Sequence, residues 1–127
     1  MSTISYRKHF IPLESNPHVF TELIHKLGVS PNLRFQDVLS LEDPDLLPHP
    51  ALALILIFPT SETYETQKSK EEATYEEYTG STDEEDVIWF KQTINNACGL
   101  YAILHAVCNG DARNFIRKLA FRFTTSR

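Results

Sequence analysis

The chain has 127 residues, of which 42% are hydrophobic, and a formal net charge of −5 at pH 7. This length suits one domain with a core, and the acidic balance argues against a nucleic-acid-binding protein, whose phosphate-facing surface would be basic. No apolar run reaches the roughly 20 residues that cross a bilayer. The two cysteines, without a recognisable signal peptide, favour a reducing compartment and no structural disulfide.

The first predicted element is a helix that follows Asn16. Its apolar side chains share one helical face, with the spacing i, i+3, i+4 and i+7: Phe20, Leu23, Ile24 and Leu27. Asn16 is a suitable N-cap, Pro17 fits the first helical position, and Gly28 stands just past the end. An ordinary core-facing helix explains this segment fully.

Three apolar segments predict short β-strands. The first is residues 35–39, and the second is the continuous apolar run 51–58, which fits a strand buried on both faces. The third, residues 87–90, leads directly into Gln92. Its Trp89 is expected to pack in the core, in preference to forming a substrate platform.

An acidic stretch, residues 62–86, separates the second and third predicted strands. It holds ten acidic residues against Lys68 and Lys70, a net charge of −8, while the whole chain carries only −5. Such a run is usually a solvated helix or a mobile loop. The alternative is a surface that attracts a basic partner.

Residues 92–99, Gln-Thr-Ile-Asn-Asn-Ala-Cys-Gly, carry the candidate chemistry. Cys98 stands at the start of an apolar helical run, where the helix dipole and free N–H groups stabilise a thiolate. Asn95 or Asn96 is the expected N-cap. Gln92 can donate its amide to the oxyanion that forms when a thiolate attacks a carbonyl, a contribution of about 3–4 kcal/mol to the barrier.

The alternative for each cysteine is an ordinary buried position, because a lone cysteine in an apolar run is usually a small hydrophobe. This explanation is adequate for Cys108, which we expect in the core. For Cys98, the spacing from Gln92 and the position at the start of a helix favour a nucleophile.

These residues resemble the nucleophile motif of the ubiquitin carboxyl-terminal hydrolase family, the papain-like cysteine deubiquitinases, which has the form Gln-Thr-Ile-x-Asn-Ala-Cys-Gly. Further segments are similar to family elements and follow in the family's order: residues 12–17 (Pro-Leu-Glu-Ser-Asn-Pro), 35–38, 52–59 and 104–106. The likeness extends over residues 10–116, about the N-terminal half of a family domain.

The resemblance implies an α/β (α+β) fold with a papain-like sheet surrounded by helices, of which residues 1–116 would form a partial catalytic domain. Residues 117–127 form a basic tail without family likeness, and we expect it to come from a truncated or misread coding region. No metal and no organic cofactor are expected. A half-length domain would leave sheet edges uncovered, so low stability and self-association are expected.

The resemblance also implies a function, thiol-dependent hydrolysis at the C-terminal glycine of ubiquitin in ubiquitin-dependent protein catabolism. Cys98 would attack the glycine carbonyl, and Gln92 with the Cys98 N–H would hold the oxyanion. Leu13 and Glu14 would line the groove for ubiquitin's basic tail, although an ordinary surface carboxylate explains Glu14 equally well. The expected location is the cytoplasm, with the nucleus as an alternative, and no membrane or nucleic-acid partner is expected.

The chain is expected to lack the histidine that serves as base for the thiol and the aspartate that orients it. In the family a histidine and then an aspartate follow the cysteine, whereas only His105 and Asp111 follow Cys98 here. His105 would lie about 10 Å further along the same helix, too far to exchange a proton with Cys98, and is expected to be structural. The other histidines are expected to be solvated: His9, His18, His25 and His49.

Two alternatives to an active hydrolase follow. Without the downstream pair, the chain could be a catalytically dead ubiquitin-binding fragment, or a fragment with no function. A redox-sensing thiol at Cys98 would need no base, but it leaves Gln92 unexplained.

Overall fold

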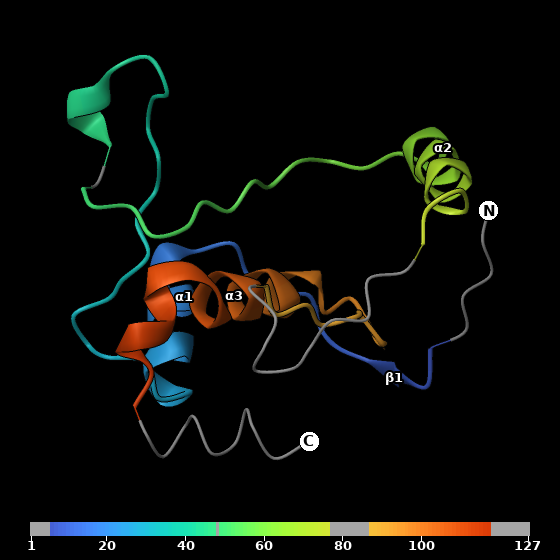
Figure 1. Ribbon diagram of the computed structural model, residues 1–127. Coiled ribbons are helices and arrows are strands. Elements are labelled where there is room, and N and C mark those ends of the chain that lie inside the picture. Colours follow the sequence, from blue (N-terminus) through green and yellow to red (C-terminus); the bar gives the residue numbers. More distant parts are fainter. Residues whose placement is uncertain (1–5, 48, 77–86, 118–127) are drawn as a thin grey trace.

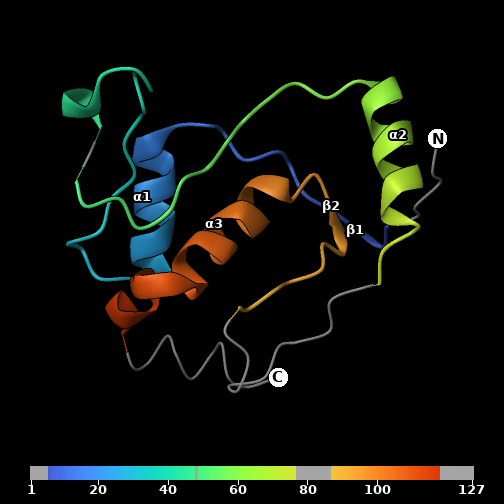
Figure 2. The ribbon, with the colours of Figure 1, turned by 45° about the horizontal axis from the view of Figure 1, so that its top comes forward.

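The computed structural model describes residues 6–47, 49–76 and 87–117. The helices and strands follow this order along the chain: β1 (Lys8–His9), α1 (Pro17–Lys26), 3-10 turn η1 (Pro44–Leu46), α2 (Glu62–Glu72), β2 (Ile94–Asn95), α3 (Cys98–Cys108) and 3-10 turn η2 (Gly110–Phe115). Figures 1 and 2 show α1 and α3 packed beside each other, with α2 standing apart from both. The predicted mixture of helices and a sheet is present only in part, because the sheet in the described residues has two strands.

Helix α1 begins and ends where the sequence predicts. The Asn16 side chain accepts a hydrogen bond of 2.9 Å from the N–H two residues further on, and Pro17 occupies the first turn. Gly28 has a φ of 103°, the left-handed region that glycine tolerates best, and so ends the helix. Phe20 and Ile24 are the buried side chains of this helix.

The core lies where α1 packs against α3. The buried side chains that contact one another come from α1, the loop after it, and the C-terminal half of α3: Phe20, Ile24, Val29, Ile103, Val107 and Cys108. Phe35 adds an edge-to-face ring contact with Phe20, at 5.4 Å between centroids. Cys108 is 4% exposed, which confirms its predicted place in the core.

The two-stranded sheet joins the N-terminal segment to the residues before α3. β1 and β2 are parallel, with Lys8 opposite Ile94 and His9 opposite Asn95. The pairing continues for one more hydrogen bond, 2.9 Å long, from the Phe10 N–H to the Asn95 carbonyl. This contact brings the N-terminal segment to the start of α3.

The three predicted strands do not form in the structure, and those predictions are wrong. Residues 35–39 are irregular, and residues 51–58 are extended without a ladder, with Leu54 75% and Leu56 81% exposed. Residues 87–90 are likewise irregular. An apolar run indicates that a segment tends to be buried, but a strand also needs a neighbouring strand for its backbone hydrogen bonds. In the described part of the chain, these three segments have no such partner strand.

Helix α2 confirms the helical alternative for the first part of the acidic stretch. The Ser61 hydroxyl caps it by accepting the Tyr64 N–H at 3.1 Å, and none of its residues is buried. The rest of the stretch, residues 77–86, lies outside the described residues, as do residues 118–127 of the basic tail. Across the described ranges, none of the helices has the length and apolarity to cross a membrane.

Candidate active site

Cys98 is the first residue of α3, and its side chain is exposed. The predicted N-cap is wrong, because the cap position is Ala97 and no side chain caps the helix. Asn95 belongs to β2, where its amide nitrogen lies 2.9 Å from Nδ1 of His9. Asn96 adopts a φ of 60°, a left-handed conformation that asparagine tolerates, and so turns the chain from β2 into α3.

Gln92 is half-buried, and its side chain is held by its own segment. The Nε2 group donates a hydrogen bond of 2.9 Å to the Ile94 carbonyl. A carboxamide carries two N–H groups, so one fixes the side chain and the second can donate to a developing oxyanion. The neighbouring Thr93 N–H donates to the Tyr101 hydroxyl at 3.2 Å, which fastens this segment to the first turns of α3, one turn after Cys98.

Leu13, one of the two predicted substrate-binding residues, lies against the first turn of α3. A Cβ atom built on Gly99 would lie 3.2 Å from Leu13 Cβ and 3.6 Å from Leu13 Cδ2. The structure therefore brings Leu13 beside the residue that follows Cys98. Glu14 is exposed, and its carbonyl accepts the Asn16 N–H at 2.9 Å.

His105 is structural, as predicted. Its Nε2 accepts the Phe90 N–H at 2.9 Å, and its ring stacks on Trp89 with 4.6 Å between centroids. Burial lowers the pKa of His105 below its ordinary value. Trp89 itself is 49% exposed, so the prediction that it packs in the core is wrong; the stack covers one of its faces.

Three of the remaining histidines, His9, His18 and His49, are exposed as the sequence predicts, and only His25 differs. His25 is part-buried and lies 2.7 Å from the Leu33 carbonyl. His49 is exposed, at 3.1 Å from the Pro44 carbonyl, and His18 is exposed on α1. His9 is also exposed, but its contact with Asn95 places it on the strand pair that leads to Cys98, and sequence reasoning had no signal for this.

The described residues form no metal site, and the second cysteine differs from Cys98 in its environment. Among the described residues, no three His, Cys, Asp or Glu side chains gather closely enough to hold a metal ion. Burial raises the pKa of the Cys108 thiol, with a smaller opposing effect of the Arg113 charge. Cys98 is exposed and Cys108 is buried, so only the first can meet a large substrate.

Comparison with known proteins identifies the family. The family model for ubiquitin carboxyl-terminal hydrolase, family 1, matches residues 10–124. The ubiquitin carboxyl-terminal hydrolase YUH1 of Saccharomyces cerevisiae is 44% identical over 105 residues, covering 80% of this chain and 41% of the relative. A ubiquitin carboxyl-terminal hydrolase of Drosophila melanogaster is 43% identical over 119 residues, covering 86% and 52%.

A third relative gives the same result. The human ubiquitin carboxyl-terminal hydrolase isozyme L1 is 40% identical over 100 residues, covering 77% of this chain and 44% of the relative. The chain thus spans about half the length of the curated relatives it matches. The family model matches most of this chain, including residues 117–124 of the tail that was expected to lack family likeness, and the chain belongs to the ubiquitin carboxyl-terminal hydrolase family 1.

Proposed function

We propose that this chain carries the nucleophile and oxyanion-binding part of a ubiquitin carboxyl-terminal hydrolase site, on a partial papain-like domain. One observation carries the proposal: an exposed Cys98 begins α3, and the segment that holds Gln92 is hydrogen-bonded to the first turns of that helix. A thiol at the amino end of a helix, with a carboxamide donor on the segment that is bonded to the same helix, suits the attack of a thiolate on a carbonyl.

The proposed chemistry begins at the sulfur of Cys98. Its thiolate forms a bond to the carbonyl carbon of ubiquitin's C-terminal glycine, and the carbonyl oxygen takes up the negative charge. The free N–H of Gln92 and the Cys98 backbone N–H donate to this oxyanion. When the intermediate collapses, the bond to the leaving group breaks, the leaving group takes a proton, and water then hydrolyses the thioester.

A second candidate function follows from the contacts of His105. His105 cannot accept the thiol proton while its Nε2 accepts the Phe90 N–H. A chain that binds ubiquitin's tail without turnover is therefore the alternative. His9, which contacts Asn95 on the strand before Cys98, is the histidine to test as a substitute base.

The proposed partner is ubiquitin, whose basic C-terminal tail would lie along Leu13 and Glu14. Leu13 lies against the first turn of α3 and Glu14 is exposed, which suits a binding groove at that place. The exposed acidic helix α2 would add a long-range attraction for a basic tail. The proposed location is the cytoplasm.

The experiment is hydrolysis of a fluorogenic amide at ubiquitin's C-terminus by the folded 127-residue chain. Turnover that Cys98→Ala abolishes and Cys108→Ala preserves would support the hydrolase. Loss of that turnover in His9→Ala, with folding intact, would assign the base to His9. Binding of ubiquitin without turnover would support the alternative, and neither binding nor turnover would contradict both.

Exposed apolar side chains in residues 51–58 support the further proposal that the chain self-associates. Leu54, Leu56 and Ile57 are 75%, 81% and 62% exposed, more than an isolated soluble chain usually shows in one run. Sedimentation velocity over a range of concentrations tests this. Larger species that disappear in a Leu54→Asp, Leu56→Asp variant are expected, and a monomer at all concentrations would contradict the proposal.

A further inference from the structure

Three polar side chains stand on a helix that is otherwise apolar. Tyr101, His105 and the C-cap residue Asn109 follow one another at i, i+4 and i+8, which places them on one stripe of α3. Cys98 lies three residues before Tyr101 and so belongs to the same stripe. The stripe connects the candidate nucleophile at one end of the helix with Asn109 at the other.

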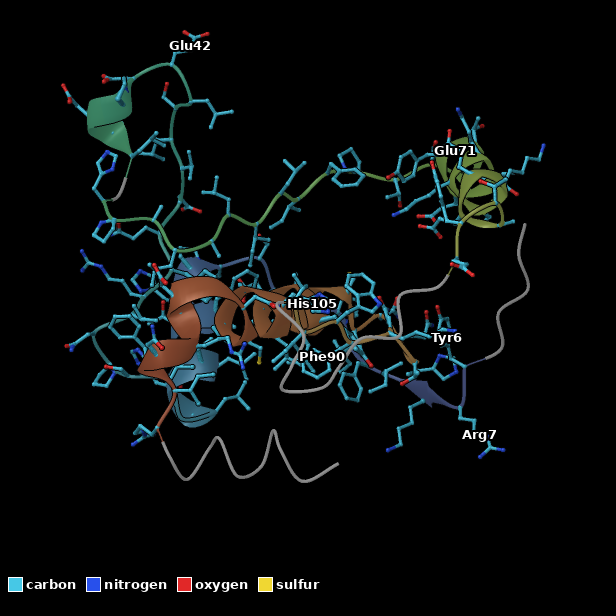
Figure 3. The ribbon with its side chains drawn as sticks, viewed as in Figure 1. Tyr6, Arg7, Glu42, Glu71, Phe90 and His105 are labelled. Atoms are coloured by element: carbon cyan, nitrogen blue, oxygen red, sulfur yellow. The ribbon has the colours of Figure 1, made fainter. Side chains whose placement is uncertain are left out.

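The end of the stripe farthest from Cys98 holds the segment that precedes Gln92. The Asn109 side chain makes both hydrogen bonds of Ile88: its Oδ1 accepts the Ile88 N–H at 2.7 Å, and its Nδ2 donates to the Ile88 carbonyl at 2.9 Å. One turn earlier on the helix, His105 Nε2 accepts the Phe90 N–H at 2.9 Å. Figure 3 shows Phe90 and His105 beside each other along α3.

The stripe continues to the residue next to Gln92. The Tyr101 hydroxyl accepts the Thr93 N–H at 3.2 Å and lies 3.3 Å from the Thr93 hydroxyl. The helix positions 109, 105 and 101 therefore meet the segment positions 88, 90 and 93 in turn. The segment runs antiparallel to the helix, and three side chains supply the hydrogen bonds that a neighbouring strand would otherwise supply.

His105 can act in this arrangement only when Nε2 carries no proton, because that nitrogen accepts a hydrogen bond. The ring is stacked on Trp89, and the Phe90 ring lies 5.7 Å away at an interplanar angle of 16°. These two aromatic rings and the single acceptor nitrogen define one orientation and one tautomer for the imidazole, with its proton on Nδ1.

We propose that Tyr101, His105 and Asn109 set the position of Gln92 relative to Cys98 through their hydrogen bonds to residues 88–93. We call these three residues the positioning ladder, and His105 is its middle member. This inference rests on the proposed function for the role of Gln92, whereas the ladder is read from the structure. The three are positioning residues and touch no substrate. Their effect would be large, because an oxyanion donor misplaced by about 1 Å costs on the order of 100-fold in rate.

The first test separates the hydrogen bond of His105 from its stacking. His105→Phe keeps a ring on Trp89 and removes the acceptor; His105→Gln restores an acceptor at the place of Nε2 and removes the ring. His18→Gln is the matched control, since His18 is an exposed histidine on α1. The measurement is amide hydrogen exchange of Phe90, together with the NMR resonances of the Gln92 side-chain amide, in the full chain.

In His105→Phe the Phe90 amide should exchange about tenfold faster, as loss of one hydrogen bond implies, and the Gln92 resonances should move. In His105→Gln both should return toward the wild-type values, and in His18→Gln neither should change. Unchanged Gln92 resonances in His105→Phe would overturn the proposal. If His105→Phe unfolds, Tyr101→Phe removes one oxygen only, and the same Gln92 resonances decide.

The second test asks whether the ladder affects the oxyanion in particular. Ubiquitin with a C-terminal aldehyde would form a hemithioacetal with Cys98 and so place an oxygen at the Gln92 amide, whereas iodoacetamide alkylates a thiolate without an oxyanion. For His105→Phe we expect aldehyde affinity to fall about 10- to 100-fold, while the alkylation rate changes less than about twofold.

The two tests fail in different ways. Equal losses in aldehyde affinity and alkylation rate would overturn the positioning role, because the damage would then be to the thiol or the fold. If the wild-type chain is alkylated at Cys98 but does not bind the aldehyde, the proposed function fails. The exchange and resonance measurements decide the ladder independently of that result.

Discussion

Truncation of Ile103 should destabilise the chain severely. Ile103 is 0% exposed and belongs to the cluster in which α3 packs against α1. Ile103→Ala removes three carbon atoms, which corresponds to about 2.4 kcal/mol of transfer free energy at about 0.8 kcal/mol per carbon. The residual cavity adds to this, so we expect a loss of about 3–4 kcal/mol in the free energy of unfolding.

The same substitution at an exposed position provides the control. Ile11 is 93% exposed, so Ile11→Ala should change the free energy of unfolding by less than about 0.5 kcal/mol. Urea unfolding followed by far-UV circular dichroism and by the fluorescence of Trp89, the only tryptophan, measures both variants. A loss below about 1 kcal/mol for Ile103→Ala, or one equal to that of Ile11→Ala, would refute the packing of α3 on α1.

The remaining predictions concern pH, thiol reactivity and the first turn of α3. Burial lowers the pKa of His105, so the unfolded chain binds a proton more readily than the folded chain. The neutral His105 therefore contributes fully to the free energy of unfolding above about pH 6.5, its ordinary value, and this contribution declines as the pH falls from there through the folded pKa. Urea midpoints from pH 7.5 to 5 should therefore fall more for the wild type than for His105→Gln, and equal declines would contradict this. In the native chain iodoacetamide should modify the exposed Cys98 and leave the buried Cys108 intact, which peptide mass spectrometry would reveal; modification of both at equal rates would show that the core is open. Gly99→Ala should move Leu13 by a few tenths of an ångström, because the new Cβ would lie 3.2 Å from Leu13 Cβ. Alanine has the better helix propensity, by about 1 kcal/mol at most, and this gain should offset the cost of the close contact and hold the free energy of unfolding nearly constant. Unmoved Leu13 methyl resonances would contradict that contact.

The helices were predictable because their signals are local. Asn16 and Pro17 start α1, and the apolar spacing that follows selects the buried face. The start of α3 at Cys98 follows from the same kind of pattern. Residues 51–58 show the limit, since their apolar character says nothing about which backbone would pair with them, and the described part of the chain supplies no partner strand.

In the candidate site, too, features with a local sequence signal were predictable and features that depend on distant contacts were not. Cys98 and Gln92 were predicted from a short motif, whose spacing suits an oxyanion donor near a thiol. The cap of α3 was missed because Asn95 belongs to β2 and Asn96 adopts a left-handed φ of 60°; the pairing of β2 with the N-terminal segment, which includes the contact of Asn95 with His9, leaves no local pattern. The i, i+4, i+8 spacing of the polar residues on α3 is a signal in the sequence, but their partners in residues 88–93 become visible only in the structure.

Cys98 is proposed here as a nucleophile for the C-terminus of ubiquitin. The most direct test of this role is intact mass spectrometry of the folded chain after incubation with ubiquitin carrying a C-terminal vinyl methyl ester. We expect one covalent adduct, which Cys98→Ser abolishes and Cys108→Ser preserves. No adduct in a folded sample, or an adduct that survives Cys98→Ser, would contradict it.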